Sequence, residues 1–243
     1  QDLVLETAEG LSSMLHWVDA EQRYVLGPPL WISQEIHDPR TSRNPSFELS
    51  YWGHALGLAL DWRERLGRAP SLGWRHILDH LSDLPQKDGR YVALESVPDT
   101  FDNPLSRRDH PTMVAPLGLL PGFDVDPATM RRTLDAVVAT WDWEGKIWGW
   151  DYPMLAMTAA RLGDRTLAVD LLLKDGPHNH YSPNGHCPQP GADLAVYLPA
   201  NGALLAAVAM MAGGWDGAPP GPAPGFPDDG SWTVAAEGLQ PLP

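Results

Sequence analysis

The sequence alternates between two kinds of helical segment, and this alternation limits the folds open to it. Segments of one kind are rich in small residues and apolar on most faces; those between them are amphipathic, with charged outer positions. The first kind is centred near residues 50, 115, 155 and 205, and the second near 75, 135 and 170. A helix that is apolar all round is buried, whereas an amphipathic helix faces water on one side. The pattern therefore predicts an α/α barrel, in which outer helices cover inner ones.

Capping signals mark the ends of the longest predicted helix. Asn44 is expected as the N-cap of a helix over 45–66, with Pro45 at its first position and Gly67 as its stop. The other helical patterns cover 2–18, 71–83, 112–120, 126–141, 153–163, 164–174 and 199–214. The last of these is apolar almost all round, so we expect it to be fully buried.

The fold class expected from these segments is all-α, an (α/α)6 toroid that is incomplete at its N-terminus. Fewer helical segments are visible than a closed ring of six helical hairpins needs, and the chain starts at Gln1 in what reads as a helix in progress. Residues 1–216 are expected to form a partial barrel, whose partner is the missing N-terminal part of the same chain. Residues 217–243 are a Pro/Gly-rich tail, and SWTVAAEGLQPLP is a possible terminal strand. An ordinary helical bundle or solenoid could show the same alternation, but it would not explain the long Trp-rich loops.

Composition excludes several classes of protein. The net charge of −14 disfavours a nucleic-acid partner or an anionic membrane surface. There is no run of about 18 apolar residues, so no membrane insertion is expected. The single cysteine, Cys187, cannot form an internal disulfide and is disfavoured as a nucleophile. Nucleophile-elbow, Walker and Rossmann motifs are absent from the sequence.

The first loop with chemical potential is WISQEIHDPRTSRNPSF, residues 31–47. Glu35 lies among apolar neighbours, so its carboxyl is expected to be partly desolvated, which raises a carboxyl pKa toward the range of a general acid. The structural alternative is that Glu35 pairs with Arg40 or Arg43 and pins the loop. His37 is expected to hydrogen-bond structurally or to a sugar hydroxyl.

The second loop, WDWEGKIWGWDYP at 141–153, contains four tryptophans before a Pro-initiated helix. Indole faces can stack on the C–H faces of pyranose rings, while neighbouring carboxylates accept hydrogen bonds from sugar hydroxyls. Trp148, Trp150 and Asp151 are the candidates for this contact, and the first two tryptophans are expected in the core. Asp151 could instead cap the following helix.

The third loop, at 178–202, raises the question of a metal site and of a second carboxylate. His178, His180 and His186 match no common zinc spacing, so we expect no metal. Asp193 is the expected second catalytic carboxylate because it precedes the most apolar helix. Asp151 and Glu237 are the other acidic candidates, and a solvated loop acid is the structural alternative for Asp193.

These motifs resemble a known family. The S-Q-E-I-H run at 33–37 and the N-P-S-F-E-L run at 44–49 are similar to the G-P-D-E-Y-H loop and the N-N-A-Y-T-N segment of glycoside hydrolase family 65, a six-hairpin glycosidase family with an (α/α)6 barrel. The later runs WGWDYPMLAMTAARLGD, NGHCPQ and YLPANGALLAAVAMM are similar to bacterial proteins described as family 65-like. The resemblance implies that Glu35 is the general acid and that His37 is the histidine near it. It also implies catalysis without a metal or organic cofactor.

One departure from the family bears on the reaction. Its phosphorylases hold phosphate with an H-G-S-S-type loop, and this chain has P-A-N-G at 199–202 near that position. The departure favours hydrolysis by water. An inverting hydrolase needs a second carboxylate roughly 6.5–9.5 Å from the acid to activate that water.

The sequence thus predicts a glycosidase that cleaves a glycosidic bond in an oligosaccharide or glycoside. Glu35 is the expected acid, Asp193 the expected base, and inversion the expected outcome. The residues expected to line the sugar site are His37, Arg40, Asn44, Trp148, Trp150, Asp151, Asn184, His186, Tyr197 and Asn201. The alternatives are a phosphorylase, a non-catalytic carbohydrate-binding barrel, and a sugar epimerase that uses His178 or His186. Localisation stays open because any signal peptide would lie upstream of this chain, and export or the periplasm is favoured over the cytoplasm.

Overall fold

The computed structural model describes residues 2–145 and 147–243, and this part of the chain is mostly helical. Its α-helices are α1 (Asp2–Ser13), α2 (Ser46–Arg65), α3 (Leu72–Asp79), α4 (Ala115–Gly118), α5 (Pro127–Thr140), α6 (Asp151–Arg161), α7 (Arg165–Leu173) and α8 (Leu198–Gly213). Two 3-10 turns, η1 (Ser106–Arg108) and η2 (Thr112–Val114), precede α4. Two small antiparallel sheets pair β1 (Leu15–Val18) with β2 (Arg23–Leu26) and β3 (Gln86–Lys87) with β4 (Arg90–Tyr91). The mainly α-helical class predicted from the sequence is therefore confirmed.

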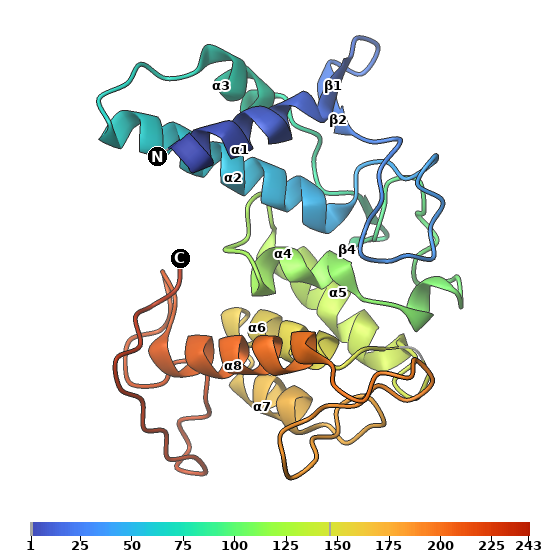
Figure 1. Cartoon of the computed structure of the whole chain (residues 1–243), viewed down its shortest axis with the longest axis vertical. Helices are drawn as coiled ribbons and strands as arrows, with labels where there is room; N and C mark the ends of the chain where they lie inside the picture. The colour runs from blue at the N-terminus through green and yellow to red at the C-terminus, as the bar shows by residue number, and fades with distance from the viewer. Residues whose placement is uncertain (1, 146) are drawn as a thin grey trace.

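The helices follow one another along the long axis of the molecule (Figure 1). Helices α1, α2 and α3 lie at one end, α4 and α5 in the middle, and α6, α7 and α8 at the other end. Helix α2 packs against α1, α3 and α4, and α6 packs against α4, α7 and α8. Two helices, α2 and α6, thus make most of the contacts between elements.

Helix α6 has the burial predicted for an inner helix. Every residue from Asp151 to Ala160 is buried. Small residues allow this close packing: a Cβ added to Gly118 of α4 would lie 2.5 Å from Thr158 Oγ1. The Thr158 hydroxyl also donates to the Val114 carbonyl at 3.0 Å, which fixes α6 against η2.

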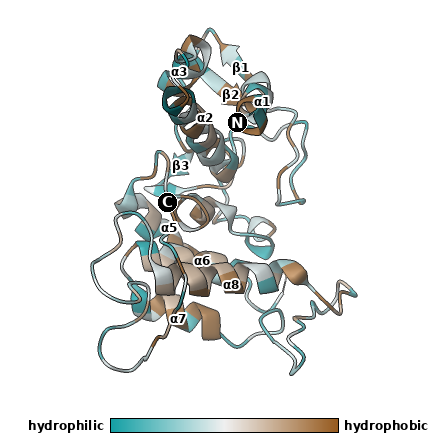
Figure 2. Cartoon of the chain, turned by 60° about the vertical axis from the view of Figure 1, so that its left-hand side comes forward, coloured by the Kyte–Doolittle hydropathy of each residue, from teal (hydrophilic) through white to brown (hydrophobic). Residues whose placement is uncertain are grey.

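Helix α8 differs from the prediction that it is fully buried. Ala207, Met210 and Met211 are buried, but Leu198 is 70% and Leu205 is 71% exposed. The described part of the chain covers α8 on the side of α6 and leaves its other side open. Figure 2 shows the hydrophobic character of both helices. A sequence that is apolar all round therefore does not decide how many of a helix's faces are covered.

The predicted helix over 2–18 was wrong after Ser13. Helix α1 ends there, and the chain turns into the β1–β2 hairpin, whose register pairs Trp17 with Tyr24. Their rings meet edge to face with centroids 5.2 Å apart, a cross-strand aromatic contact that stabilises a hairpin. Gln22 occupies the turn with a φ of 53°. A period-3.6 pattern in the sequence thus extended over four residues that form a strand.

Helix α2 confirms the predicted segment 45–66, but its start is built differently. Pro45 is the N-cap and makes no side-chain capping bond. Asn44, predicted as the cap, is buried with a φ of 46°. Its side-chain oxygen accepts from the Leu26 amide at 2.9 Å, and its side-chain amide donates to Glu95. The role of Asn44 is therefore to tie β2 to the segment after β4.

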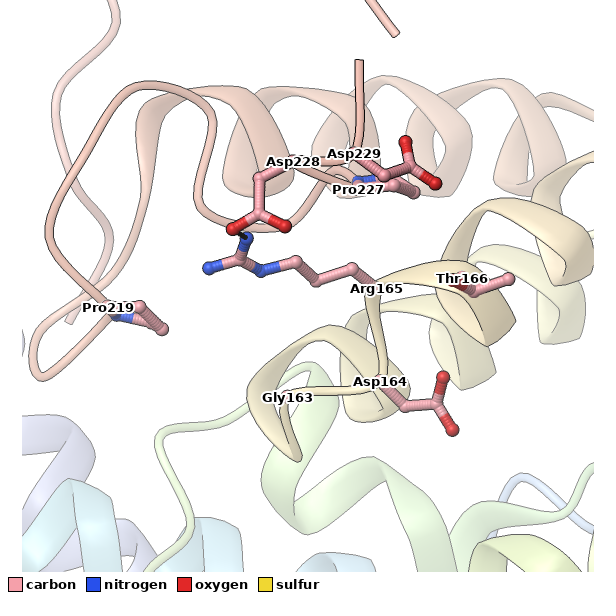
Figure 3. Close-up of a pocket in the computed structure, with 8 residues that line it drawn as sticks. All are labelled: Gly163, Asp164, Arg165, Thr166, Pro219, Pro227, Asp228 and Asp229. Carbon is pink, nitrogen blue, oxygen red and sulfur yellow. Dashed lines mark hydrogen bonds and ion pairs between the residues drawn. The ribbon is translucent and has the colours of Figure 1, made fainter. Parts of the chain in front are cut away.

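The tail is irregular from 217 to 230, as predicted, and its end pairs with the residues after α8 by a single bridge instead of forming a strand. That bridge joins Trp215 and Leu242. Arg165 at the start of α7 forms an ion pair with Asp228 at 2.6 Å, beside a surface pocket of about 430 Å³ (Figure 3). Arg161 donates to the Pro243 carbonyl at 2.8 Å. Two arginines thus hold the tail against the α6–α7 corner.

Candidate active site

Four loops that are distant in the sequence meet at one pocket of about 230 Å³. They precede α2, η2, α6 and α8, and they lie along the right-hand side of Figure 1. The residues that line the pocket are Ser33, Glu35, Asp109, His110, Trp148, Leu194 and Tyr197. The N-terminal ends of helices thus surround the pocket, and such ends favour negative charge.

Three of the predicted site residues line this pocket, namely Glu35, Trp148 and Tyr197. Two more lie directly behind it. Asp151 hydrogen-bonds to the pocket residue His110, and the Trp150 ring packs on the same imidazole with centroids 4.6 Å apart. Loops separated by more than 150 positions therefore contribute predicted residues to one place.

Glu35 is exposed in a turn, so the expectation that its carboxyl is partly desolvated was wrong. The expected alternative, an ion pair between Glu35 and Arg40 or Arg43, is replaced by ion pairs with other acids. Arg40 pairs with Asp38 at 2.6 Å, and Arg43 pairs with Glu21 at 2.7 Å. The carboxyl of Glu35 is therefore open to water at the pocket wall.

The sequence analysis missed two residues of the pocket, Asp109 and His110. They lie in the R-R-D-H-P run before η2, a segment to which no sequence pattern assigned a role. Both are buried, at 9% and 8% exposure. The Trp141 indole donates to the Asp109 carbonyl at 2.5 Å, and the Gln34 side chain donates to the His110 carbonyl. An acid next to a histidine and a proline was the signal available in the sequence.

Asp151 fixes the His110 imidazole. Its two oxygens lie 2.9 and 3.0 Å from His110 Nδ1, and one of them also accepts from the Trp148 amide at 2.8 Å. The Asp151 side chain is fully buried at the first position of α6, where the helix dipole favours its charge. Asp151 is thus a support of the pocket wall, neither a helix N-cap nor a lining residue.

Burial and charge act in opposite directions on the two missed groups. Burial lowers the pKa of His110, but the charge and hydrogen bond of Asp151, with the charges of Asp109 and Glu35, outweigh burial and raise this pKa overall. Burial also raises the pKa of the Asp109 carboxyl, against the opposing effects of His110. The pocket therefore holds a carboxyl group with a raised pKa beside a histidine that favours its charged form.

Aromatic rings form one wall of the pocket. The Trp148 and Tyr197 rings have centroids 5.4 Å apart and planes inclined by 36°, and Trp148 lies 6.0 Å from the His110 ring. Burial raises the pKa of the Tyr197 phenol, which therefore stays neutral as a hydrogen-bond donor. The wall offers both a flat apolar face and a hydroxyl.

The remaining predicted site residues have structural or exposed positions. Asp193 is exposed with a φ of 52°, next to the lining residue Leu194. Asn201 donates to the Gly185 carbonyl at 2.8 Å, which ties the third loop to α8. Of the other predicted sugar ligands, His37 is half-buried, Arg40 pairs with Asp38, and Asn44 is buried where it bonds to β2. Asn184 and His186 are both exposed, with Asn184 Nδ2 3.4 Å from His186 Nδ1. Glu237 is exposed on the tail.

The three histidines of the third loop differ in burial and in their contacts. His178 is buried between the Gln189 side chain and the Gly145 carbonyl, each at 3.2 Å, whereas His180 and His186 are exposed. Across residues 2–145 and 147–243, no three histidine, cysteine, aspartate or glutamate side chains are grouped to hold a metal ion. Cys187 is buried, and burial raises the pKa of its thiol.

Comparison with other proteins does not identify the chain: no family model matches the sequence, and no curated protein matches it significantly. Within the described residues, every helix is too short or too polar to cross a membrane. The chemistry of the pocket therefore has to carry the assignment of function.

Proposed function

We propose that the chain is part of a family 65-like (α/α)6 glycosidase domain that hydrolyses a glycosidic bond in an oligosaccharide or glycoside. The observation that carries this proposal is the meeting of Glu35 and Asp109, from separate loops, in one pocket with an aromatic wall. Glycoside hydrolysis needs two carboxyl groups across the scissile bond. The flat face of Trp148 is suited to stack on a sugar ring.

The two carboxyl groups have environments that suit different roles. Asp109 is buried and its pKa is raised by that burial, which suits a general acid that protonates the leaving glycosidic oxygen. Glu35 is exposed, so it can accept a proton from an attacking water. The family resemblance assigned the acid role to Glu35 and the sequence assigned the base to Asp193. Burial favours Asp109 as the acid, with Glu35 as the base.

The charge of the pocket favours water over phosphate as the attacking group. Of the described residues that line it, two are carboxylic acids and His110 alone is a cation. A phosphate dianion entering this space would be repelled by Glu35 and by the nearby Asp151. Hydrolysis is therefore the better-supported reaction, with phosphorolysis as the alternative.

The arrangement of the helices also supports the proposed (α/α)6 barrel. Loops that enter α2, α6 and α8 lie at one rim, as in a ring of inner helices with a common orientation. The open apolar face of α8, which includes Leu205, is the kind of surface that a further helix of such a ring would cover.

A sugar epimerase is the second candidate, because His110 is held by the buried Asp151 as a proton-transfer group would be. The histidines first considered for this role, His178 and His186, lie outside the lining of the pocket. A non-catalytic sugar-binding barrel is less favoured, since it predicts no second carboxyl group beside Glu35, whereas Asp109 lines the same pocket.

The test is a product assay on a panel of disaccharides and aryl glycosides, with and without inorganic phosphate. Hydrolysis predicts free sugars at a rate that phosphate leaves unchanged, and Glu35→Gln lowers this rate by about 10²–10⁴-fold. Sugar 1-phosphate would indicate a phosphorylase, and an isomerised sugar with its linkage intact would indicate an epimerase. A Glu35→Gln variant with the wild-type rate would refute the role of Glu35.

A further inference from the structure

The proposed reaction does not use the imidazole that lies between two buried aspartates. His110 Nδ1 is 2.9 Å from Asp151 Oδ1, and His110 Nε2 is 3.6 Å from Asp109 Oδ1. Asp151 is supplied by the start of α6 and Asp109 by the segment before η2. The two ring nitrogens thus face carboxyl groups from different parts of the chain.

This geometry favours the charged form of His110. Carboxylate oxygens accept hydrogen bonds, and a neutral imidazole has one N–H group, whereas the imidazolium has two. A buried carboxylate is also costly unless a cation or donor compensates it. An imidazolium compensates the buried Asp151 carboxylate, and its charge opposes the burial that raises the pKa of Asp109.

The two contacts of His110 are unequal. The contact with Asp151 has hydrogen-bond length, and the Trp148 amide and the Trp150 ring hold the pair in place. The contact with Asp109, at 3.6 Å, is an ion-pair distance that is too long for a hydrogen bond. Asp109 Oδ1 accepts instead from the His110 backbone N–H at 2.7 Å. Asp151 therefore anchors the imidazole, and no hydrogen bond from the ring occupies the Asp109 carboxyl.

We propose that His110 is a positioning residue, anchored on Asp151, whose positive charge sets how tightly Asp109 holds its proton. The titratable groups that face it are Asp151 from α6, Asp109 from its own segment, Glu35 from the loop before α2, and Tyr197 at the start of α8. The catalytic consequence of this role rests on the proposed function.

Replacing His110 with glutamine removes the charge and keeps a polar side chain of similar reach. Asp109 then faces Asp151 and Glu35 without an intervening cation, so its carboxyl holds the proton more tightly. We expect the titration midpoint of Asp109, followed by carbon NMR of labelled aspartate in the whole chain, to rise by about one pH unit or more. A midpoint equal to that of the wild type would overturn the proposal.

A measurement on the unaltered protein keeps the test valid if His110→Gln fails to fold. Nitrogen NMR of the histidine rings should show both nitrogens of His110 protonated at pH 6, because the pKa of this imidazole is raised above its ordinary value. Asp151→Asn should lower the His110 midpoint. A neutral His110 at pH 6 in the wild type would contradict the proposal.

Activity separates this inference from the proposed function. If Asp109 is the general acid, the alkaline limb of the kcat/KM profile moves to higher pH in His110→Gln, and added imidazole moves it back. His178→Gln, at a buried histidine outside the lining of the pocket, is the matched control and leaves the limb in place. A shifted Asp109 midpoint without any sugar turnover would support the inference and refute the glycosidase. Sugar turnover with an unshifted pH profile in His110→Gln would support the glycosidase and refute the inference.

Discussion

Asp151 and His110 lie 2.9 Å apart, Oδ1 to Nδ1, although 41 positions separate them in the sequence. The carboxylate is fully buried, and the imidazole is nearly so. Removing one partner of a buried ion pair leaves the other uncompensated. This contact should therefore matter for stability as well as for the pocket.

We expect Asp151→Asn to lower the free energy of unfolding by about 3 kcal/mol at pH 5–6. The folded-state pKa of His110 is raised, so its contribution is complete below the unfolded value and is lost as pH rises through the folded value. The difference between variant and wild type should then shrink as the pH rises above about 6.5. Urea unfolding at several pH values checks this, and a difference that grows with pH would contradict it.

Trp148→Ala should weaken substrate binding because the indole forms the flat wall of the pocket beside Tyr197. An aromatic contact of about 0.5–1.5 kcal/mol corresponds to a roughly 3- to 10-fold rise in KM. Trp232→Ala is the control, since that ring packs on Phe226 in the tail. Equal effects of the two substitutions on KM would remove Trp148 from the sugar site.

Glu48→Gln should change the pH dependence of stability. Burial in the first turn of α2 raises the pKa of the Glu48 carboxyl to about 7, against a smaller opposing effect of its own backbone amide. The unfolded chain releases this proton near pH 4.5, so the wild type loses stability between pH 4.5 and 7. The variant avoids this loss and should be more stable by roughly 1–3 kcal/mol at pH 8, with no gain at pH 4. A gain that is the same at both pH values would show that ionisation of Glu48 is not its cause.

Two apolar residues of α8 should respond differently to truncation. Met211 is fully buried, so Met211→Ala should cost about 2–5 kcal/mol of stability. Leu205 is 71% exposed, so Leu205→Ala should change stability by about 0.5 kcal/mol or less. Thermal unfolding of both variants measures the pair. A large loss in Leu205→Ala would show that its face is covered in solution.

Local chemistry made part of the fold predictable. Asp126 and Asp164 precede helices, and their carboxylates accept from the amides of Thr129 at 2.7 Å and Leu167 at 3.1 Å. Such caps depend on neighbouring residues, so the sequence reveals them. Gly67, predicted as a stop, has a φ of 66° after α2.

The errors came from long-range contacts. Asn44 looks like an N-cap, but its buried side chain bonds to Leu26 and Glu95, which lie 18 and 51 positions away. Helix α8 was expected to be covered all round because composition cannot count its neighbours. Tertiary context decided both positions.

The candidate site shows the same division. Aromatic loop residues such as Trp148 are visible in the sequence as a group. The partnership of Asp109 with the pocket depends on the segment before η2 meeting the loop of Glu35, 74 positions earlier, and no local pattern encodes that approach. The exposed Asp193 was chosen instead because it precedes an apolar helix.

The most direct measurement of the central claim is the hydrolytic rate of Asp109→Asn beside that of Asp193→Asn, on the best substrate of the wild type. Asparagine keeps the shape of each side chain and removes the titratable carboxyl group. We predict that Asp109→Asn lowers kcat/KM by about 10²–10⁴-fold and that Asp193→Asn leaves it close to the wild-type value. Wild-type activity in Asp109→Asn, or a loss confined to Asp193→Asn, would contradict the account.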